Sequence, residues 1–252
     1  MKAVLFVALA AAAVVFYLFL LQVIGRWPAA FVLAAVVLLL NKLFFRSEGR
    51  PLAEIGVDAP RVRARQVAVA FVVGVIVVAV WALILVFIAG AHWQRAAHVD
   101  PAAFVAAIAF AVFNNLAEEL VYRGYLFVLL ARTFHTAVAV IVTSVLFTLL
   151  HIQAGVPWTN ALAIVFTSAL MFAALFARWR SVPLVAGFHV AMNCAQEFLG
   201  LRATGLTVFT LVYPSPLNAP QTTSVLLLTA ATNLMVAGLV FASKPRSAKV
   251  DR

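Results

Sequence analysis

The chain has 252 residues, of which 66% are hydrophobic and only 10% are charged, and its formal net charge is +10. A soluble chain carries nearer a quarter of charged residues, so a charged, water-exposed surface of the usual kind is excluded. The positive charge does not indicate a nucleic-acid partner, because most basic residues stand in short stretches between long apolar runs, as they do in membrane proteins.

Eight apolar runs follow one another, and each is long enough, or nearly so, to cross a hydrocarbon core of about 30 Å as a helix. They cover residues 3–24, 28–45, 67–90, 102–131, 136–152, 159–177, 182–200 and 223–243. No clear small-residue cleavage site follows the first run, so we interpret it as a retained helix and not as a signal peptide. The pattern predicts an all-α membrane protein with about eight transmembrane helices in the lipid bilayer.

The basic residues are divided unevenly between the two sides that eight crossings define. Of the 18 Lys and Arg residues, only Arg26, Arg95 and Arg202 lie on the side opposite the termini, and Arg123 lies within a run. Since Lys and Arg are retained on the cytoplasmic side, both termini are predicted to be cytoplasmic in a multi-pass protein of a bacterial plasma membrane. The single Cys194 excludes a disulfide within the chain, and we interpret it as a packing residue.

The fourth run holds three charges and two amides within ten residues, although a charge at the bilayer centre costs about 2.5–3.5 kcal/mol. Steps of four along a helix separate its polar side chains into two stripes, namely Asn115, Glu119 and Arg123, and beside them Asn114, Glu118 and Tyr122. Glu119 can therefore pair with Arg123 one turn away. Glu118 points about 100° away and is the better placed of the two acids to face a water or a substrate.

Two later runs add imidazoles and an amide at helical spacing. Phe147 and His151 are one turn apart in the fifth run, and His189 and Asn193 are one turn apart in the seventh. Glu197 continues the second stripe, and we favour a position at the membrane interface over one in the site. A single His or Asn in a membrane helix is usually a helix–helix hydrogen-bonding residue, and a Glu–Arg pair also fits a structural clamp or a proton relay. The conjunction on three helices favours a catalytic site.

The order Glu-Glu-x-x-x-Arg, Phe-x-x-x-His and His-x-x-x-Asn resembles the CPBP (Abi) group of intramembrane proteases. That group includes the type II CAAX prenyl proteases and proteins linked to bacteriocin processing and self-immunity. The matching residues are Glu118, Glu119, Arg123, Phe147, His151, His189 and Asn193. The resemblance implies an α-helical membrane domain with a catalytic cavity among its helices.

The resemblance also implies a role for each residue. Glu118 and His151 would hold and activate a water for attack on a peptide carbonyl. His189 and Asn193 would stabilise the resulting oxyanion, which is a large term in acyl transfer. Glu119 and Arg123 would position the site, and we expect the supporting residues to be Phe147, Asn115 and Tyr122.

Three regions follow from this interpretation. Residues 1–101 hold N-terminal transmembrane helices and a basic cytoplasmic loop, residues 102–200 form the catalytic core, and residues 201–252 form a loop, the last transmembrane helix and a basic tail. A catalytic metal such as zinc is an open alternative, with Glu118, His151 and His189 as ligands. We favour a water activated without a metal or other cofactor, because no His-Glu-x-x-His motif is present.

The leading hypothesis is an endopeptidase that acts on a membrane-associated peptide or protein. The alternative is a non-catalytic binding or bacteriocin self-immunity protein of the same fold. A small proton-coupled transporter is less favoured, because no pair of interrupted helices occurs in two halves of the chain. The sequence names neither the substrate nor the oligomeric state.

Overall fold

The computed structural model describes residues 2–57, 60–202 and 207–243, and most of that part of the chain is helical. The elements in chain order are α1 (Lys2–Ile24), α2 (Arg26–Arg46), the 3-10 helix η1 (Leu52–Ile55), α3 (Pro60–Ala89), β1 (His92–Arg95), α4 (Pro101–Tyr122), α5 (Tyr125–Thr133), α6 (Thr136–Gln153), α7 (Trp158–Asn160), the π-helix η2 (Ala161–Phe166), α8 (Thr167–Trp179), α9 (Val182–Phe198), β2 (Phe209–Val212) and α10 (Ala219–Ala242).

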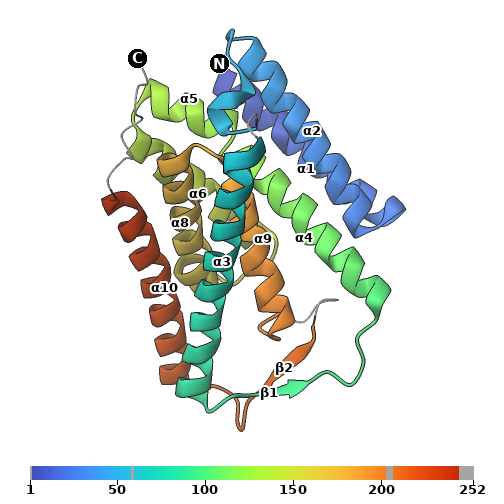
Figure 1. Cartoon of the computed structure of the whole chain (residues 1–252), viewed down its shortest axis with the longest axis vertical. Helices are drawn as coiled ribbons and strands as arrows, with labels where there is room; N and C mark the ends of the chain where they lie inside the picture. Colours follow the sequence, from blue (N-terminus) through green and yellow to red (C-terminus); the bar gives the residue numbers. More distant parts are fainter. Residues whose placement is uncertain (1, 58–59, 203–206, 244–252) are drawn as a thin grey trace.

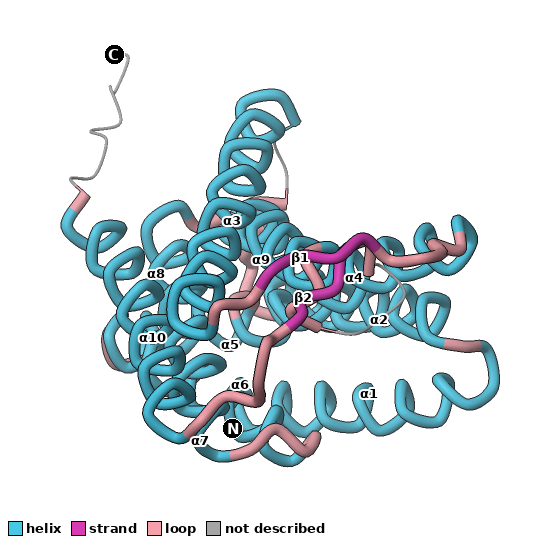
Figure 2. Tube along the Cα trace, turned by 90° about the horizontal axis from the view of Figure 1, so that it is seen from below, coloured by secondary structure: helices cyan, strands magenta, loops and turns pink. Residues whose placement is uncertain are grey.

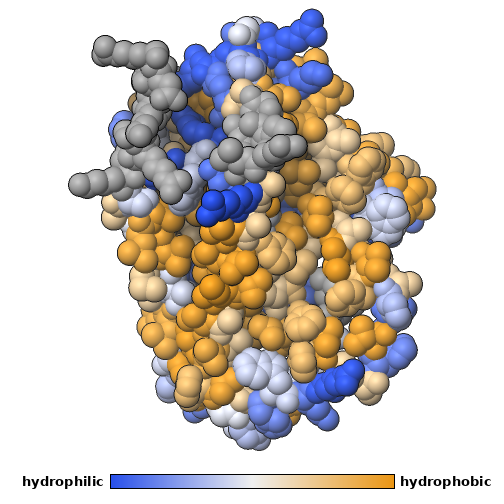
Figure 3. Space-filling view, viewed as in Figure 1, coloured by the Kyte–Doolittle hydropathy of each residue, from blue (hydrophilic) through white to orange (hydrophobic). Residues whose placement is uncertain are grey.

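All eight predicted runs fold as helices, which confirms the all-α membrane class. Seven helical segments in the described residues are long and apolar enough to cross a membrane. The remaining run is the seventh, α9, whose 17 residues reach only about 25 Å and so fall slightly short of a full crossing by length alone. On the face drawn in Figure 3, apolar side chains cover the flank between two more polar ends. Exposed apolar side chains of the bundle include Phe87 of α3 and Leu227 of α10, which suits contact with lipid.

The bundle has two distinct ends (Figure 1). At the first, which we call the termini end, Glu48 accepts hydrogen bonds from Lys2 and Arg132, so the start of α1, the end of α2 and the end of α5 meet there. At the opposite strand end, β1 pairs antiparallel with β2, with Arg95 opposite Phe209. Figure 2 views this end directly and shows the two strands crossing in front of the helix ends.

The fourth apolar run is broken at Arg123 and Gly124, and α5 turns away from α4 across the termini end (Figure 1). The Asn41 side chain of α2 stabilises this break, since its amide nitrogen donates to Leu120 O at 3.0 Å and its amide oxygen accepts from Tyr125 N at 2.6 Å. A Cβ on Gly124 would lie 2.1 Å from that same amide oxygen. Only glycine fits there, so the break places Arg123 at the end of α4.

Helices from all parts of the chain pack on the predicted catalytic core. α3 lies along α9, and α2 lies along α4. Gly74 allows the close approach of α3 to α9, because a Cβ at this position would come within 2.6 Å of Phe188 O. Small residues commonly serve this purpose between membrane helices. The first 101 residues are therefore not a separate body, and the predicted division into three regions stays a prediction.

Candidate active site

A cavity of about 390 Å³ lies inside the bundle. It is lined by side chains of α3, α4, α6, α8 and α9, by the segment between α6 and α8, by Arg26 of α2 and by Arg202 after α9. Six of the predicted site residues line it, namely Asn115, Glu118, Phe147, His151, His189 and Asn193. The remaining three, Glu119, Tyr122 and Arg123, are buried among the helices and are not among its lining residues. The structure thus brings α4, α6 and α9 together around one hollow.

Glu119 and Arg123 form the predicted ion pair. Arg123 Nη1 lies 3.3 Å from both carboxylate oxygens of Glu119, and both side chains are fully buried. Arg123 Nη2 also donates to Ala169 O of α8 at 2.9 Å. A buried pair needs such additional hydrogen bonds, because taking two charges out of water costs several kcal/mol per ion. The pair therefore fastens α4 to α8.

His189 joins this pair to the cavity. Its Nδ1 lies 2.9 Å from Glu119 Oε1, and because a carboxylate can only accept, Nδ1 carries the proton. Its Nε2 lies 3.9 Å from Glu118 Oε2 on the cavity side. The ring is consequently held in one orientation between a buried carboxylate and a cavity-lining one.

Two phenylalanines stack against the imidazoles. Phe147 lies 4.4 Å from the His151 ring and Phe172 lies 4.4 Å from the His189 ring, each measured between ring centroids. The Arg123 guanidinium carbon lies 5.1 Å and 5.5 Å from the same two rings, within cation–π range. The aromatic pair therefore fixes both imidazoles and surrounds the buried cation.

Glu118 and His151 present the basic side of the cavity. The Glu118 side chain keeps 22% of its surface exposed, whereas that of Glu119 is fully covered. The Asn114 amide donates to Glu118 Oε1 at 2.7 Å, which orients the carboxylate. His151 Nδ1 donates to Phe147 O at 2.8 Å, so in the neutral ring Nε2 keeps its lone pair. A carboxylate and an unprotonated imidazole nitrogen are both acceptors suited to a water.

Asn193 of α9 and Asn115 of α4 present amides to the cavity. Asn193 Nδ2 donates to Asn115 Oδ1 at 2.9 Å, and its own amide oxygen accepts from Arg202 Nη1 at 3.4 Å. Because an amide nitrogen has two hydrogens, one N–H of Asn193 is left by the bond to Asn115. The remaining supporting residue, Tyr122, packs edge-on against Phe147 with 5.1 Å between centroids.

Several lining residues were missed by the sequence analysis. Phe172 and Trp81 gave no signal, because they are apolar residues in apolar runs. Arg26 and Arg202 were interpreted only as loop residues, yet both line the cavity. The favoured position of Glu197 outside the site was wrong, because its side chain is buried and lines the cavity. Its place in the stripe of His189 was the signal that could have found it.

The metal alternative needs three ligands close together. Across the residues that the structure describes, no group of three His, Cys, Asp or Glu side chains is arranged to hold a metal ion. Glu118 and His189 approach each other, but His151 does not complete a ligand cluster with them. The arrangement does not fit the proposed ligand set, so we derive no step through a metal, and cofactor dependence stays a prediction.

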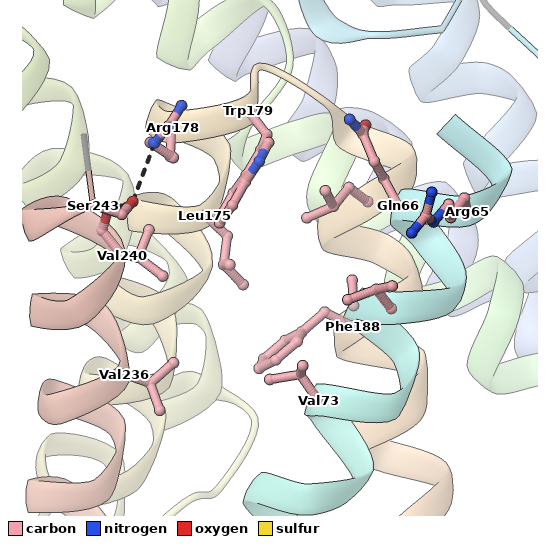
Figure 4. A pocket seen from close by; sticks show the side chains of 13 residues that line it. Arg65, Gln66, Val73, Leu175, Arg178, Trp179, Phe188, Val236, Val240 and Ser243 are labelled. Atoms are coloured by element: carbon pink, nitrogen blue, oxygen red, sulfur yellow. Dashed lines mark hydrogen bonds between the residues drawn. The ribbon is translucent and has the colours of Figure 1, made fainter. Parts of the chain in front are cut away.

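A larger hollow of about 760 Å³ lies between α3, α8, α9 and α10 (Figure 4). Its walls are mainly apolar, with Val73, Phe188 and Val236 in the lower part of the view and Arg65 and Arg178 above them. None of its described lining residues is an acid or a histidine. The smaller cavity is therefore the candidate active site, since it alone of the two holds acid–base groups.

Comparison with known proteins gives one family. Residues 100–195 match the family described as type II CAAX prenyl endopeptidase Rce1-like, a segment that holds all nine predicted site residues. No curated protein and no solved structure gives a significant match. The match supports the resemblance seen in the three motifs, and it is carried by residues 100–195 of this multi-pass membrane protein.

Proposed function

We propose that the protein is an endopeptidase that hydrolyses a peptide bond of a membrane-associated substrate with a water activated by Glu118 and His151. The observation that carries this proposal is the separation of the two acids. Glu119 is buried in a pair with Arg123, while Glu118 faces the cavity beside two imidazoles. One acid therefore serves structure, and the other is available for acid–base chemistry.

In the proposed mechanism, the water donates one hydrogen bond to Glu118 and one to His151 Nε2. Glu118 takes a proton as the water oxygen bonds to the carbonyl carbon, which produces a tetrahedral oxyanion. The same proton then passes from Glu118 to the leaving amine nitrogen as the C–N bond breaks. The products are a carboxylic acid and an amine, so atoms and charges balance without a further reactant.

The oxyanion would be stabilised by Asn193 and His189. The second N–H of Asn193 is one donor, and His189 is the other when its ring carries a proton on Nε2 as well as on Nδ1. Glu119 holds the ring in place through its 2.9 Å contact with Nδ1. Loss of one oxyanion donor typically costs about 100- to 1,000-fold in rate. The fixed ring of His189 supports this role, because a preorganised donor does not need to reorient during the reaction.

The test is cleavage of fluorogenic peptides by the purified protein in detergent. We expect Glu118→Gln and His151→Gln each to lower kcat by at least about 100-fold, as for loss of a general base. Asp100→Asn is the matched control, because it makes the same carboxylate-to-amide change at an exposed helix cap that asparagine also satisfies. Equal cleavage by all four proteins would refute the assignment, and cleavage by none would favour the non-catalytic binding or immunity alternative.

Cofactor dependence needs a separate arm of the same assay. We expect exhaustive chelation to leave the rate unchanged, since the proposed water is activated by Glu118 and His151 alone. A loss of activity on chelation that added zinc restores would replace this proposal with the metal alternative. Both outcomes are measured on wild-type protein, so they do not depend on the folding of any variant.

A further inference from the structure

The candidate site opens toward one end of the bundle. Arg26, Val156, Asn160 and Arg202 are the residues of helix beginnings and connections that line the cavity, and all stand at the end remote from the termini. None of its described lining residues comes from the connections of the termini end, which hold residues 46–57, 123–135 and 180–181. The route for a substrate therefore leads from the strand end.

Two of the proposed site side chains lie near the strand end, whereas Glu118 stands four residues before the end of α4 at the termini end. His151 stands two residues before the end of α6 and Asn193 five residues before the end of α9, and both helices end at the strand end. At 1.5 Å per residue these positions are about 3 Å and about 8 Å from the helix ends. α4 diverges from α9 toward the same end (Figure 1).

The distribution of basic residues indicates which side of the membrane the termini end faces. The described basic residues of the termini end are Lys2, Lys42, Arg46, Arg50, Arg65, Arg132, Arg178 and Arg180. At the strand end the described residues supply only Arg26, Arg95 and Arg202. Lys and Arg near short loops are retained in the cytoplasm, so this bias directs the termini end to the cytoplasm and the strand end away from it.

Together these two observations decide from which side a substrate arrives. We infer that the site is entered from the non-cytoplasmic face of the membrane and that its substrate is a peptide segment exposed on that face, such as the part of an exported or membrane-anchored protein next to the bilayer. A lipidated C-terminus of a cytoplasmic protein would meet the closed end of the bundle. This substrate class rests on the proposed peptidase function, whereas the direction of entry does not.

Thiol labelling of intact spheroplasts tests the direction of entry without any catalysis. In a Cys194→Ala background, Asn160→Cys places a thiol at an exposed position of the cavity lining, and Ser47→Cys places one at an exposed position of the termini end. We expect a membrane-impermeant maleimide to label Asn160→Cys in intact spheroplasts and to label Ser47→Cys only after permeabilisation. The reverse pattern, or labelling of both or neither in intact spheroplasts, overturns the inference.

A second experiment tests the substrate class. Wild-type protein is reconstituted in liposomes, and the fraction with its termini outside is removed on an affinity resin through a tag at the N-terminus. A soluble peptide cleaved in detergent is then supplied outside or enclosed inside. We expect cleavage only of the outside peptide, and cleavage only of the enclosed one overturns the inference. Failure to cleave in detergent refutes the proposed function alone, because the labelling result still decides the side of entry.

Discussion

Replacing Arg123 with methionine removes a cation that the fold buries completely. Glu119 is then left at a position with no exposed surface, without the guanidinium that lies 3.3 Å away in the wild type. Breaking a buried pair in this way costs about 3–5 kcal/mol. For a chain of this size about 1 kcal/mol corresponds to about 2–4 °C in Tm, so we expect Tm to fall by roughly 6–20 °C.

The double variant Glu119→Gln/Arg123→Met separates charge burial from packing. It leaves no buried charge in the pair, and such neutral replacements are often close to neutral for stability. We expect its Tm to recover most of the loss, with a coupling free energy between the two sites above about 2 kcal/mol. Circular dichroism of the purified proteins in detergent measures all four corners of this cycle. A coupling near zero would refute the reasoning, because it would mean that the two groups are solvated independently.

The same double variant tests the positioning role of Glu119. Without the carboxylate, His189 loses the charged partner of its Nδ1, although the fold is retained. We expect kcat to fall by at least about tenfold, equal to about 1.4 kcal/mol of transition-state stabilisation. Recovery of both stability and full activity would show that the pair serves the fold alone.

Three other substitutions test separate parts of the structure. Phe172→Leu removes the ring 4.4 Å from that of His189, and we expect kcat to fall several-fold with KM little changed, measured beside Tm to separate folding from activity. Gly124→Ala places a Cβ 2.1 Å from the side-chain oxygen of Asn41, and we expect it to lower the free energy of unfolding by more than about 1 kcal/mol. In the control Gly238→Ala the new Cβ meets nothing within 4 Å, and we expect the free energy of unfolding to rise by up to about 1 kcal/mol. The hydroxyl of Tyr125, and after it Arg132 and Lys2, hold the pKa of Glu48 below its ordinary value of 4.5. Glu48 therefore stabilises the fold above pH 4.5, and this contribution is lost as the pH falls through the lowered pKa of the folded state. Thermal unfolding between pH 7 and pH 3 should therefore show a smaller acid-induced loss for Glu48→Gln than for the wild type.

Helical spacing was enough to predict the local part of the site. Glu119 and Arg123 are four residues apart, and this alone predicts the pair that the structure contains at 3.3 Å. The same rule separated Glu118 from Glu119 and placed His189 and Asn193 on one face. These predictions succeeded because one helical turn is a fixed geometry that needs no knowledge of the neighbouring helices.

Contacts between helices were beyond this kind of reasoning. Ala169 offers only a backbone carbonyl to Arg123, and every residue has one, so no residue type could indicate the bond. Phe172 stacks on His189 from α8, but a phenylalanine in an apolar run is also what lipid contact requires. Asn41 differs from these residues, because an amide in an apolar run indicates a buried polar contact. The sequence does not indicate that its partners are the backbone groups on either side of Gly124.

Glu197 shows why depth in the membrane cannot be inferred from the ends of apolar runs alone. It lies one residue before the end of α9, where an exposed helix end would leave a carboxylate in water. The chain instead folds back over this end, because Trp93 Nε1 of β1 donates to Leu199 O and β1 pairs with β2. The strand pair therefore covers the helix end that it borders and leaves Glu197 facing the cavity. The two short strands are not predicted by an all-α pattern, yet their position turns a residue of the helix end into a lining residue of the site.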